Sequence, residues 1–263
     1  MAVTTDLDVA AVRTDLEAAG LLPPGRVGAY VVGSLARGWG NPGSDIDLLV
    51  VLAEQWHGPT AARLDVSLEP GFITAETGRA AGRRCDLKYW LVDQVAQLVA
   101  KVGREELLAG RITPNSFSPD ELAVLERIDH AVPVDGEGRL REWQAALHRS
   151  AYRSVVVNRA FSWADNYAED AVGQLAVDDL DSAVLSARLA FGHCMNGLLA
   201  GHGELDENPK WRARRFRSAL PPELTFEEYW AIETMRTFDP ADPRPWVEAV
   251  VELCRRIQME VSI

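Results

Sequence analysis

Short apolar runs separated by turn-forming residues dominate the first third of the chain. An apolar run of four to eight residues bounded by glycine, proline or polar residues predicts a buried strand, and strict alternation predicts a half-buried one. These patterns predict four strands, at Val27–Val32, Ile46–Leu52, Arg63–Leu68 and Arg84–Leu91. Apolar residues at helical spacing predict two helices in the same stretch, at Leu7–Ala19 and, more briefly, at Ser34–Trp39.

After about residue 93 the apolar positions recur at helical spacing only. The predicted helices are Gln94–Val102, Glu121–Asp129, Leu140–Asp170, Asp181–Leu199, Phe226–Met235 and Trp246–Met259. The segment VPVDGEG (Val132–Gly138) consists largely of turn-forming residues. We place a domain boundary there, between a first domain of residues 1–135 and a second of residues 136–263; an interior loop of one compact domain is the alternative. Strands followed by helices predict the α+β class, with a helical bundle as the second domain.

Composition narrows the cellular setting and the partners. The 263 residues are 47% hydrophobic and 25% charged, which is typical of a globular protein. No apolar run approaches the roughly 20 residues that span a bilayer, and the first 20 residues lack the basic start of a signal peptide. Cys85, Cys194 and Cys254 are odd in number and widely spaced, which indicates reduced thiols and predicts a cytoplasmic protein.

The net charge of −12 bears on the class of partner. An acidic surface repels phosphate backbones, so we expect no nucleic-acid partner. The lack of a spanning apolar run predicts that the protein has no membrane partner either. The same surface would attract a cationic small molecule. The alternative interpretation is that the charge only keeps the protein in solution.

Two aspartates carry the strongest chemical signal. Asp45 and Asp47 are two residues apart at the start of a predicted strand, so both side chains face the same way. Adjacent carboxylates repel each other unless a cation lies between them. Mg²⁺ prefers oxygen ligands and commonly shares them with substrate phosphates, and two such ions can clamp a phosphoryl or nucleotidyl transfer. The pair alone would be weak evidence, but it follows VVGS and lies within SDIDLLV.

Two further features support this hypothesis. Gly33-Ser34 lies where a predicted strand meets a predicted helix, and such a turn lets backbone amides and a hydroxyl approach phosphate oxygens. Asp86 lies on a later predicted strand and would complete a carboxylate triad if the two strands are neighbours. It could then hold metal or accept a proton from an acceptor hydroxyl. Asp65 is the competing candidate for the third acid, and a solvated surface acid is the alternative for Asp86.

The order Gly33-Ser34, Asp45-x-Asp47, Asp86 resembles the nucleotidyltransferase superfamily of the DNA polymerase β type. LLAGRITP (Leu107–Pro114), LSAR ending at Arg188, and Pro209-Lys210 resemble the aminoglycoside (streptomycin/spectinomycin 3″/9) adenylyltransferases. The resemblance implies a nucleotidyltransferase domain with a mixed sheet and a helical domain that closes over nucleotide and acceptor. It also implies transfer of AMP from ATP to a hydroxyl of an aminoglycoside-type antibiotic.

The resemblance also implies roles for particular residues. Asp45 and Asp47 would hold two Mg²⁺ ions, and Asp86 would be the third ligand and the catalytic base, where the family usually has the longer glutamate. The residues that would contact the nucleotide are Gly33, Ser34, Ser44, Arg188, Lys210 and Tyr229. The residues that would contact a cationic acceptor are Trp163, Asp178 and Asp181.

Each of these assignments has a structural alternative. Arg188 could form a helix-face ion pair, Lys210 and Tyr229 could be structural, and Asp178–Asp181 could cap a helix. The basic run WRARRFR (Trp211–Arg217) could face phosphates or solvent. At the level of function, the alternatives are another acceptor (a natural-product intermediate, a tRNA or a protein) and a nucleotide-binding regulator without activity.

Overall fold

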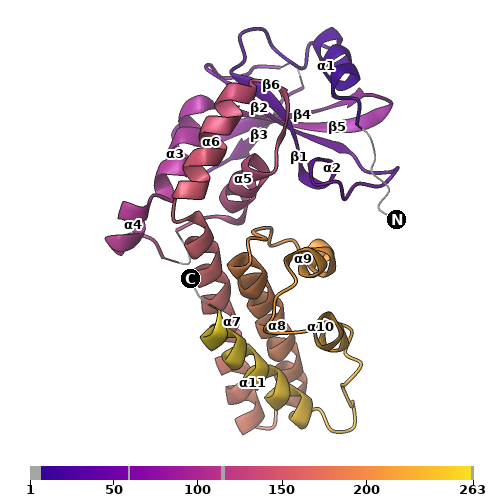
Figure 1. Cartoon of the computed structure of the whole chain (residues 1–263), viewed down its shortest axis with the longest axis vertical. Helices are drawn as coiled ribbons and strands as arrows, with labels where there is room; N and C mark the ends of the chain where they lie inside the picture. Colours follow the sequence, from indigo (N-terminus) through magenta and orange to yellow (C-terminus); the bar gives the residue numbers. More distant parts are fainter. Residues whose placement is uncertain (1–6, 59, 114–115, 262–263) are drawn as a thin grey trace. The chain divides into compact units, whose positions relative to one another are not determined.

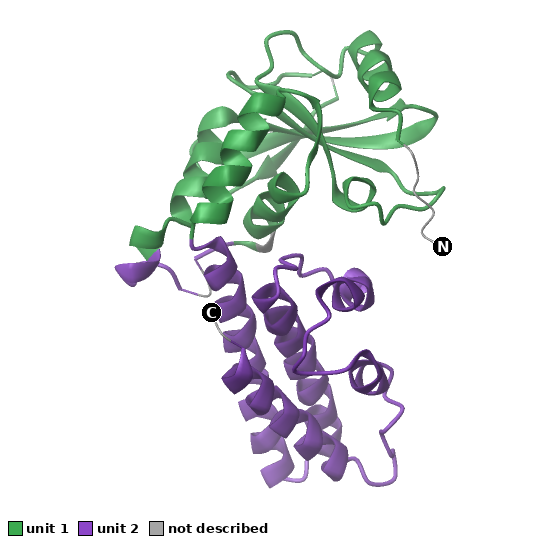
Figure 2. Cartoon of the chain, in the orientation of Figure 1, with its two compact units in different colours: residues 1–106, 118–150 green, residues 107–117, 151–263 purple. Residues whose placement is uncertain are grey.

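The computed structural model describes residues 7–58, 60–113 and 116–261. By their contacts they form two compact units, which are considered separately here (Figure 2). The first comprises residues 1–106 and 118–150, and the second residues 107–117 and 151–263. The chain first passes from one unit to the other within the short helix α4 (Arg104–Leu108).

A six-stranded mixed sheet forms the first unit, in the order β3-β4-β5-β2-β1-β6 (Figure 1). Its strands are β1 (Gly28–Val32), β2 (Ile46–Leu52), β3 (Ala62–Asp65), β4 (Phe72–Ala80), β5 (Arg83–Leu91) and β6 (Val132–Asp135). The pair β2–β5 is parallel and the other neighbouring pairs are antiparallel. Because β2 and β5 both begin at the same edge, acids near the start of each strand come together there.

Helices cover both faces of the sheet, and alternation along β2 separates two apolar layers. Ile46, Leu48 and Val50 face α1 (Val9–Ala18) and join its Val12 and Leu16 in one core. The other face packs against α3 (Val92–Lys101), α5 (Pro119–Asp129) and α6 (Glu137–Arg149), as Figure 1 shows. Asp47 alternates with Ile46 and Leu48, so its side chain lies on this second face.

Three helices build the core of the second unit. The helices α7 (Tyr152–Ala176), α8 (Leu180–Gly201) and α11 (Arg244–Glu260) pack against one another (Figure 1). Small residues allow close approach, since a Cβ at Gly197 would lie 2.4 Å from the Phe161 ring. The shorter helices are η1 (Pro209–Trp211), α9 (Arg212–Ala219) and α10 (Phe226–Glu233). Cys194 and Cys254 lie buried here and Cys85 lies buried in the first unit, all as free thiols.

The predicted fold class is confirmed, and three of the differences in element assignment bear on the architecture. The sequence analysis missed β4, whose run FITAETGRA mixes Glu76 and Gly78 with apolar residues. It assigned a turn to Val132–Gly138, of which Val132–Asp135 forms the edge strand β6. A proline is tolerated there because it lies on an edge strand.

The third difference is a helix break. The predicted helix Leu140–Asp170 is two helices, because Ser150 adopts an extended conformation after α6 and its hydroxyl donates to the Leu147 carbonyl. The chain passes from the first unit to the second for the last time between residues 150 and 151, whereas the sequence analysis placed the domain boundary after residue 135. The helix α6 packs on the sheet, where Trp143 meets Tyr30 edge-to-face at 6.1 Å.

Candidate active site

The register of β2 and β5 brings two of the predicted acids side by side. Asp47 and Asp86 are direct partners across the parallel pair, so their side chains lie on the same face of the sheet. Asp45 is exposed and immediately precedes β2. Asp65 lies on β3, which two strands separate from β2; its side chain is 84% exposed and paired with Arg63 at 3.2 Å. The structure therefore places Asp86, and not Asp65, beside Asp47.

Asp47 lies in an environment that disfavours an isolated negative charge. Burial is the largest effect and raises the pKa of its carboxyl above the ordinary value, and the charges of Asp86 and Asp45 add to this. Arg127 on α5 and Lys88 on β5 act in the opposite direction. A buried carboxylate next to a second acid is the arrangement that a bound cation relieves.

Gly33 forms a tight turn against Asp47. The antiparallel pair β1–β2 sets Val32 opposite Asp47, so the chain turns beside that carboxylate into the short helix α2 (Gly33–Ala36). Gly33 has φ +70°, and a Cβ there would lie 2.7 Å from the Asp47 Oδ2 atom. Glycine is needed both for the left-handed backbone and for the close approach.

The loop before β2 is held by its own backbone and by one arginine. The Ser44 hydroxyl accepts from the Asn41 amide at 2.9 Å, and the Ser44 amide donates to the Asn41 carbonyl at 2.9 Å. The Arg83 guanidinium donates to three carbonyls of this loop, those of Asn41, Pro42 and Ser44. Ser34 is partly exposed in the first turn of α2. Phosphate contacts by Ser34 and Ser44 stay predictions.

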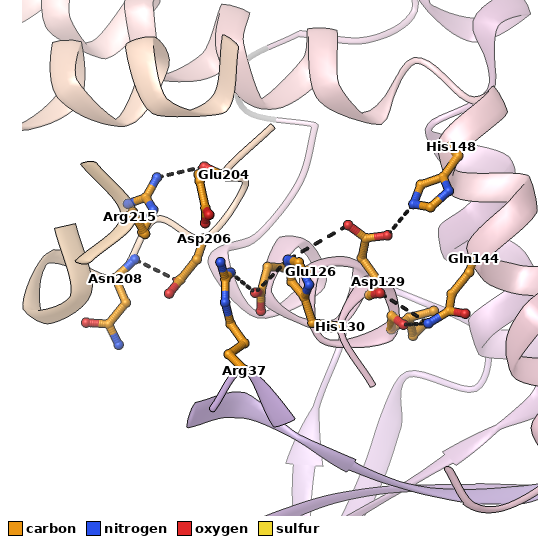
Figure 3. Close-up of polar contacts among 11 residues, drawn as sticks. Arg37, Glu126, Asp129, His130, Gln144, His148, Glu204, Asp206, Asn208 and Arg215 are labelled. Carbon is orange, nitrogen blue, oxygen red and sulfur yellow. Dashed lines mark hydrogen bonds and ion pairs between the residues drawn. The ribbon is translucent and has the colours of Figure 1, made fainter. Parts of the chain in front are cut away.

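An ion pair joins α5 to the segment after α2. Arg37 pairs with Glu126 at 2.8 Å, and their side chains are 7% and 10% exposed (Figure 3). At the end of α5, His148 of α6 contacts Asp129 at 2.6 Å. These contacts hold α5, and with it Arg127, over the face that carries Asp47.

The acids at this edge fit a metal ion that takes the rest of its ligands from elsewhere. Within the described ranges, no three His, Cys, Asp or Glu side chains converge closely enough to hold a metal. Mg²⁺ commonly uses one or two carboxylates and completes its shell with water and substrate phosphates. Asp47 and Asp86, with Asp45 beside them, match that donor set. Asp86 is paired with Arg84 at 3.1 Å across an exposed surface, which is a weak contact.

The residues predicted to contact the nucleotide from the second unit have different surroundings. Arg188 is exposed on α8 and lines a cavity of about 590 Å³. Lys210 is exposed, with its ammonium 5.2 Å from the centre of the Trp211 ring. Tyr229 is 1% exposed and stacks on Phe216 at 4.7 Å. Burial also raises the pKa of Tyr229 far above the ordinary value. Contact between Tyr229 and a nucleotide stays a prediction.

The residues predicted to contact the acceptor also differ in their surroundings. Trp163 stacks with Tyr167 and His193 on the helical bundle. Asp178 has φ +58° in the turn before α8 and pairs with Arg244 at 2.6 Å. Asp181 is exposed in the first turn of α8, where an acid stabilises the helix. The structural alternative therefore accounts for Asp178 and Asp181.

The basic run of α9 points in two directions. Arg215 is fully buried and donates to Asn196 and to the Glu204 carbonyl, and Arg212 is bound by both carboxylate oxygens of Glu233. Outward, Arg214 lies over the Trp211 ring and Arg217 over the Phe226 ring. Neither of the two alternatives, phosphate-facing or solvent-facing, holds for the whole run, because α9 buries Arg212 and Arg215.

Sequence reasoning missed two cations of the first unit. Lys88 follows Asp86 by two positions on a strand and so shares its face, which alternation could have shown. Arg127 lies on α5, distant in sequence, and only the packing of α5 against the sheet brings it near Asp47.

No helix in the described ranges is long and apolar enough to cross a membrane.

Comparison with known proteins agrees with this geometry. Residues 14–101 match the model of the nucleotidyltransferase domain family. A crystal structure of a nucleotidyltransferase-like protein from Exiguobacterium sibiricum aligns with a TM-score of 0.51 at 11% identity, over 95% of this chain and 74% of that one. No curated protein sequence matches the chain. The family match runs from within α1 to the end of α3 and includes Gly33, Asp45, Asp47 and Asp86, so the sheet domain of this chain has the nucleotidyltransferase fold.

Proposed function

We propose that this protein transfers AMP from ATP to a hydroxyl of a small molecule. The observation that carries the proposal is the pairing of Asp47 with Asp86 across β2 and β5, with the Gly33 turn packed against Asp47. The nucleotidyltransferase domain supports nucleotidyl transfer in general. ATP as donor, Mg²⁺ as cofactor and a small-molecule acceptor are our inferences from the residues and from the resemblance.

The proposal gives each acid and cation at the site of the first unit a separate role. Asp45 and Asp47 would hold Mg²⁺, which when bound neutralises phosphate charge and activates the α-phosphate. Asp86, on the next strand, orients the acceptor hydroxyl and accepts its proton as the oxygen attacks. Gly33 and Ser34 bind the phosphate oxygens through backbone amides and the hydroxyl. Lys88 and Arg127 add positive charge beside the acids and stabilise the charge that develops on the departing pyrophosphate.

The resemblance to aminoglycoside adenylyltransferases makes those antibiotics the first acceptors to assay. The net charge of −12 favours a cationic small molecule over a tRNA. The Asp178–Asp181 region does not add to this argument, since Asp178 is paired with Arg244 and the Asp179 side chain caps α8. The acceptor class must therefore come from experiment.

The test is pyrophosphate release from ATP and Mg²⁺ with a panel of aminoglycosides, including streptomycin and spectinomycin, and with hydroxyl-bearing metabolites. Mass spectrometry would detect an acceptor that has gained AMP. Asp45→Asn should reduce turnover at least about a hundredfold, because it removes a metal ligand. Asp65→Asn is the matched control, since Asp65 is distant from β2. ATP binding with no turnover on any acceptor would instead indicate a regulator, and full turnover by Asp45→Asn would refute the metal site.

A further inference from the structure

The helical unit contains a cavity of about 590 Å³ that lies wholly within that unit. Its volume is in the range of small-molecule binding sites. One wall is apolar: Leu185 and Leu189 of α8 are 60% and 47% exposed there, and Phe191, Ile232 and Trp246 complete it. A ligand with a flat or apolar ring system would cover this wall and remove its apolar surface from water.

The charged groups around the cavity are paired, with one exception. Glu207 accepts from Arg159 through both oxygens, at 2.9 and 2.7 Å. Glu233 accepts from Arg212 through both oxygens, at 3.0 and 2.9 Å. Arg188 is exposed and has no hydrogen bond or ion pair to any residue in the described part of the chain. The unpaired charge of the lining is therefore positive.

Two ring nitrogens of the lining also have no hydrogen-bond partner among the described residues. They are Nδ1 of His193 and Nε1 of Trp246, and Trp246 is 5% exposed. Burial, followed by Arg159 and Arg212, lowers the pKa of His193, so its ring is neutral at pH 7. The Trp246 nitrogen can only donate. Both nitrogens are buried behind the surface of the lining, so the unpaired charge that a ligand meets in the cavity is that of Arg188.

We propose that this cavity binds a small organic acid with a flat apolar body, its carboxylate or sulfonate held by Arg188. A polycationic molecule would meet Arg188 and find both carboxylates already neutralised by arginines. Binding itself does not depend on the activity of the first unit.

The probe is 1-anilino-8-naphthalenesulfonate, titrated by fluorescence into the full-length protein without ATP or Mg²⁺. N-phenyl-1-naphthylamine has the same rings without the sulfonate and serves as the uncharged control. Arg188→Gln should weaken binding of the sulfonate about tenfold or more, because a charge-assisted contact is lost, and should leave the uncharged probe unaffected. Arg255→Gln is the matched variant, an exposed arginine of α11 outside the cavity.

A second variant tests the apolar wall. Leu189→Trp fills the cavity from an exposed position and should reduce binding of both probes, with an unchanged circular dichroism spectrum showing that the fold is intact. Equal sulfonate affinity in wild type and Arg188→Gln would overturn the proposal. Displacement of the sulfonate by ATP would assign the cavity to the nucleotide, and displacement by streptomycin would assign it to a cation; either result refutes it. Asp47→Asn should bind the probe as wild type does, which separates this test from the proposed function.

Discussion

Replacing Gly33 with alanine tests whether the close packing of the turn against Asp47 matters for catalysis. The left-handed backbone alone costs alanine about 1–2 kcal/mol of folding free energy. A Cβ at Gly33 would also lie 2.7 Å from Oδ2 of Asp47, too close for carbon and oxygen, so the carboxylate must move. Gly38 provides the matched control, because it has φ +67° and a Cβ placed there would meet no atom within 4 Å.

Both variants should therefore lose a similar 1–2 kcal/mol in urea unfolding, and only Gly33→Ala should lose activity beyond that. Because we propose Asp47 as a metal ligand, we expect displacement of its carboxylate to reduce pyrophosphate release at saturating ATP about tenfold or more. Gly38→Ala should stay within about twofold of wild type, because no catalytic group moves. Equal activities of the two variants would refute the argument that Gly33 positions Asp47.

Three further predictions follow from single contacts. Asp47→Asn should abolish transfer yet stabilise the metal-free protein at neutral pH. Because burial raises the pKa of Asp47, the contribution of this carboxyl to wild-type stability falls as pH rises from its unfolded-state pKa through its folded-state pKa. Urea unfolding in EDTA over that pH range should show that the variant lacks this contribution. Asp86→Asn should lower turnover at least about a hundredfold, and Asp65→Asn should lower it less than about twofold. A larger loss of turnover for Asp65→Asn than for Asp86→Asn in steady-state kinetics would make Asp65 the third acid. Arg215→Ala should lower the free energy of unfolding by about 2–4 kcal/mol in chemical unfolding, because it removes a fully buried cation that donates to Asn196 and to the Glu204 carbonyl. A loss of stability no greater than that caused by Arg214→Ala would contradict this.

Local patterns were sufficient to predict the strands that carry the site. The apolar runs at Val27–Val32 and Ile46–Leu52 lie within one residue of β1 and β2, because a buried strand must be apolar on both faces. The spacing of Asp45 and Asp47 predicted their shared face in the same way. The strand β4 escaped detection because Glu76 is buried there among apolar neighbours, which no local pattern signals.

The choice between Asp86 and Asp65 required the tertiary structure. Both residues lie on strands, and the sequence does not say which strand pairs with β2. The sheet order settles the geometry by setting Asp86 in register with Asp47 and leaving Asp65 on the edge strand β3. Strand pairing depends on long-range hydrogen bonds and packing, which are invisible to periodicity.

The sequence by itself determined the α+β class, the apolar strands and the residue types of the candidate site, since these follow from alternation and short-range spacing. The tertiary structure decided which of the predicted residues are available. Tyr229 and Arg215 lie in the interior of the helical unit, whereas Asp178 pairs with Arg244 at the surface. It also brought Arg127 to the site and gathered Arg188 with Trp246 around one cavity. Burial and pairing arise from contacts between segments that are distant in sequence, so only the folded chain reveals them.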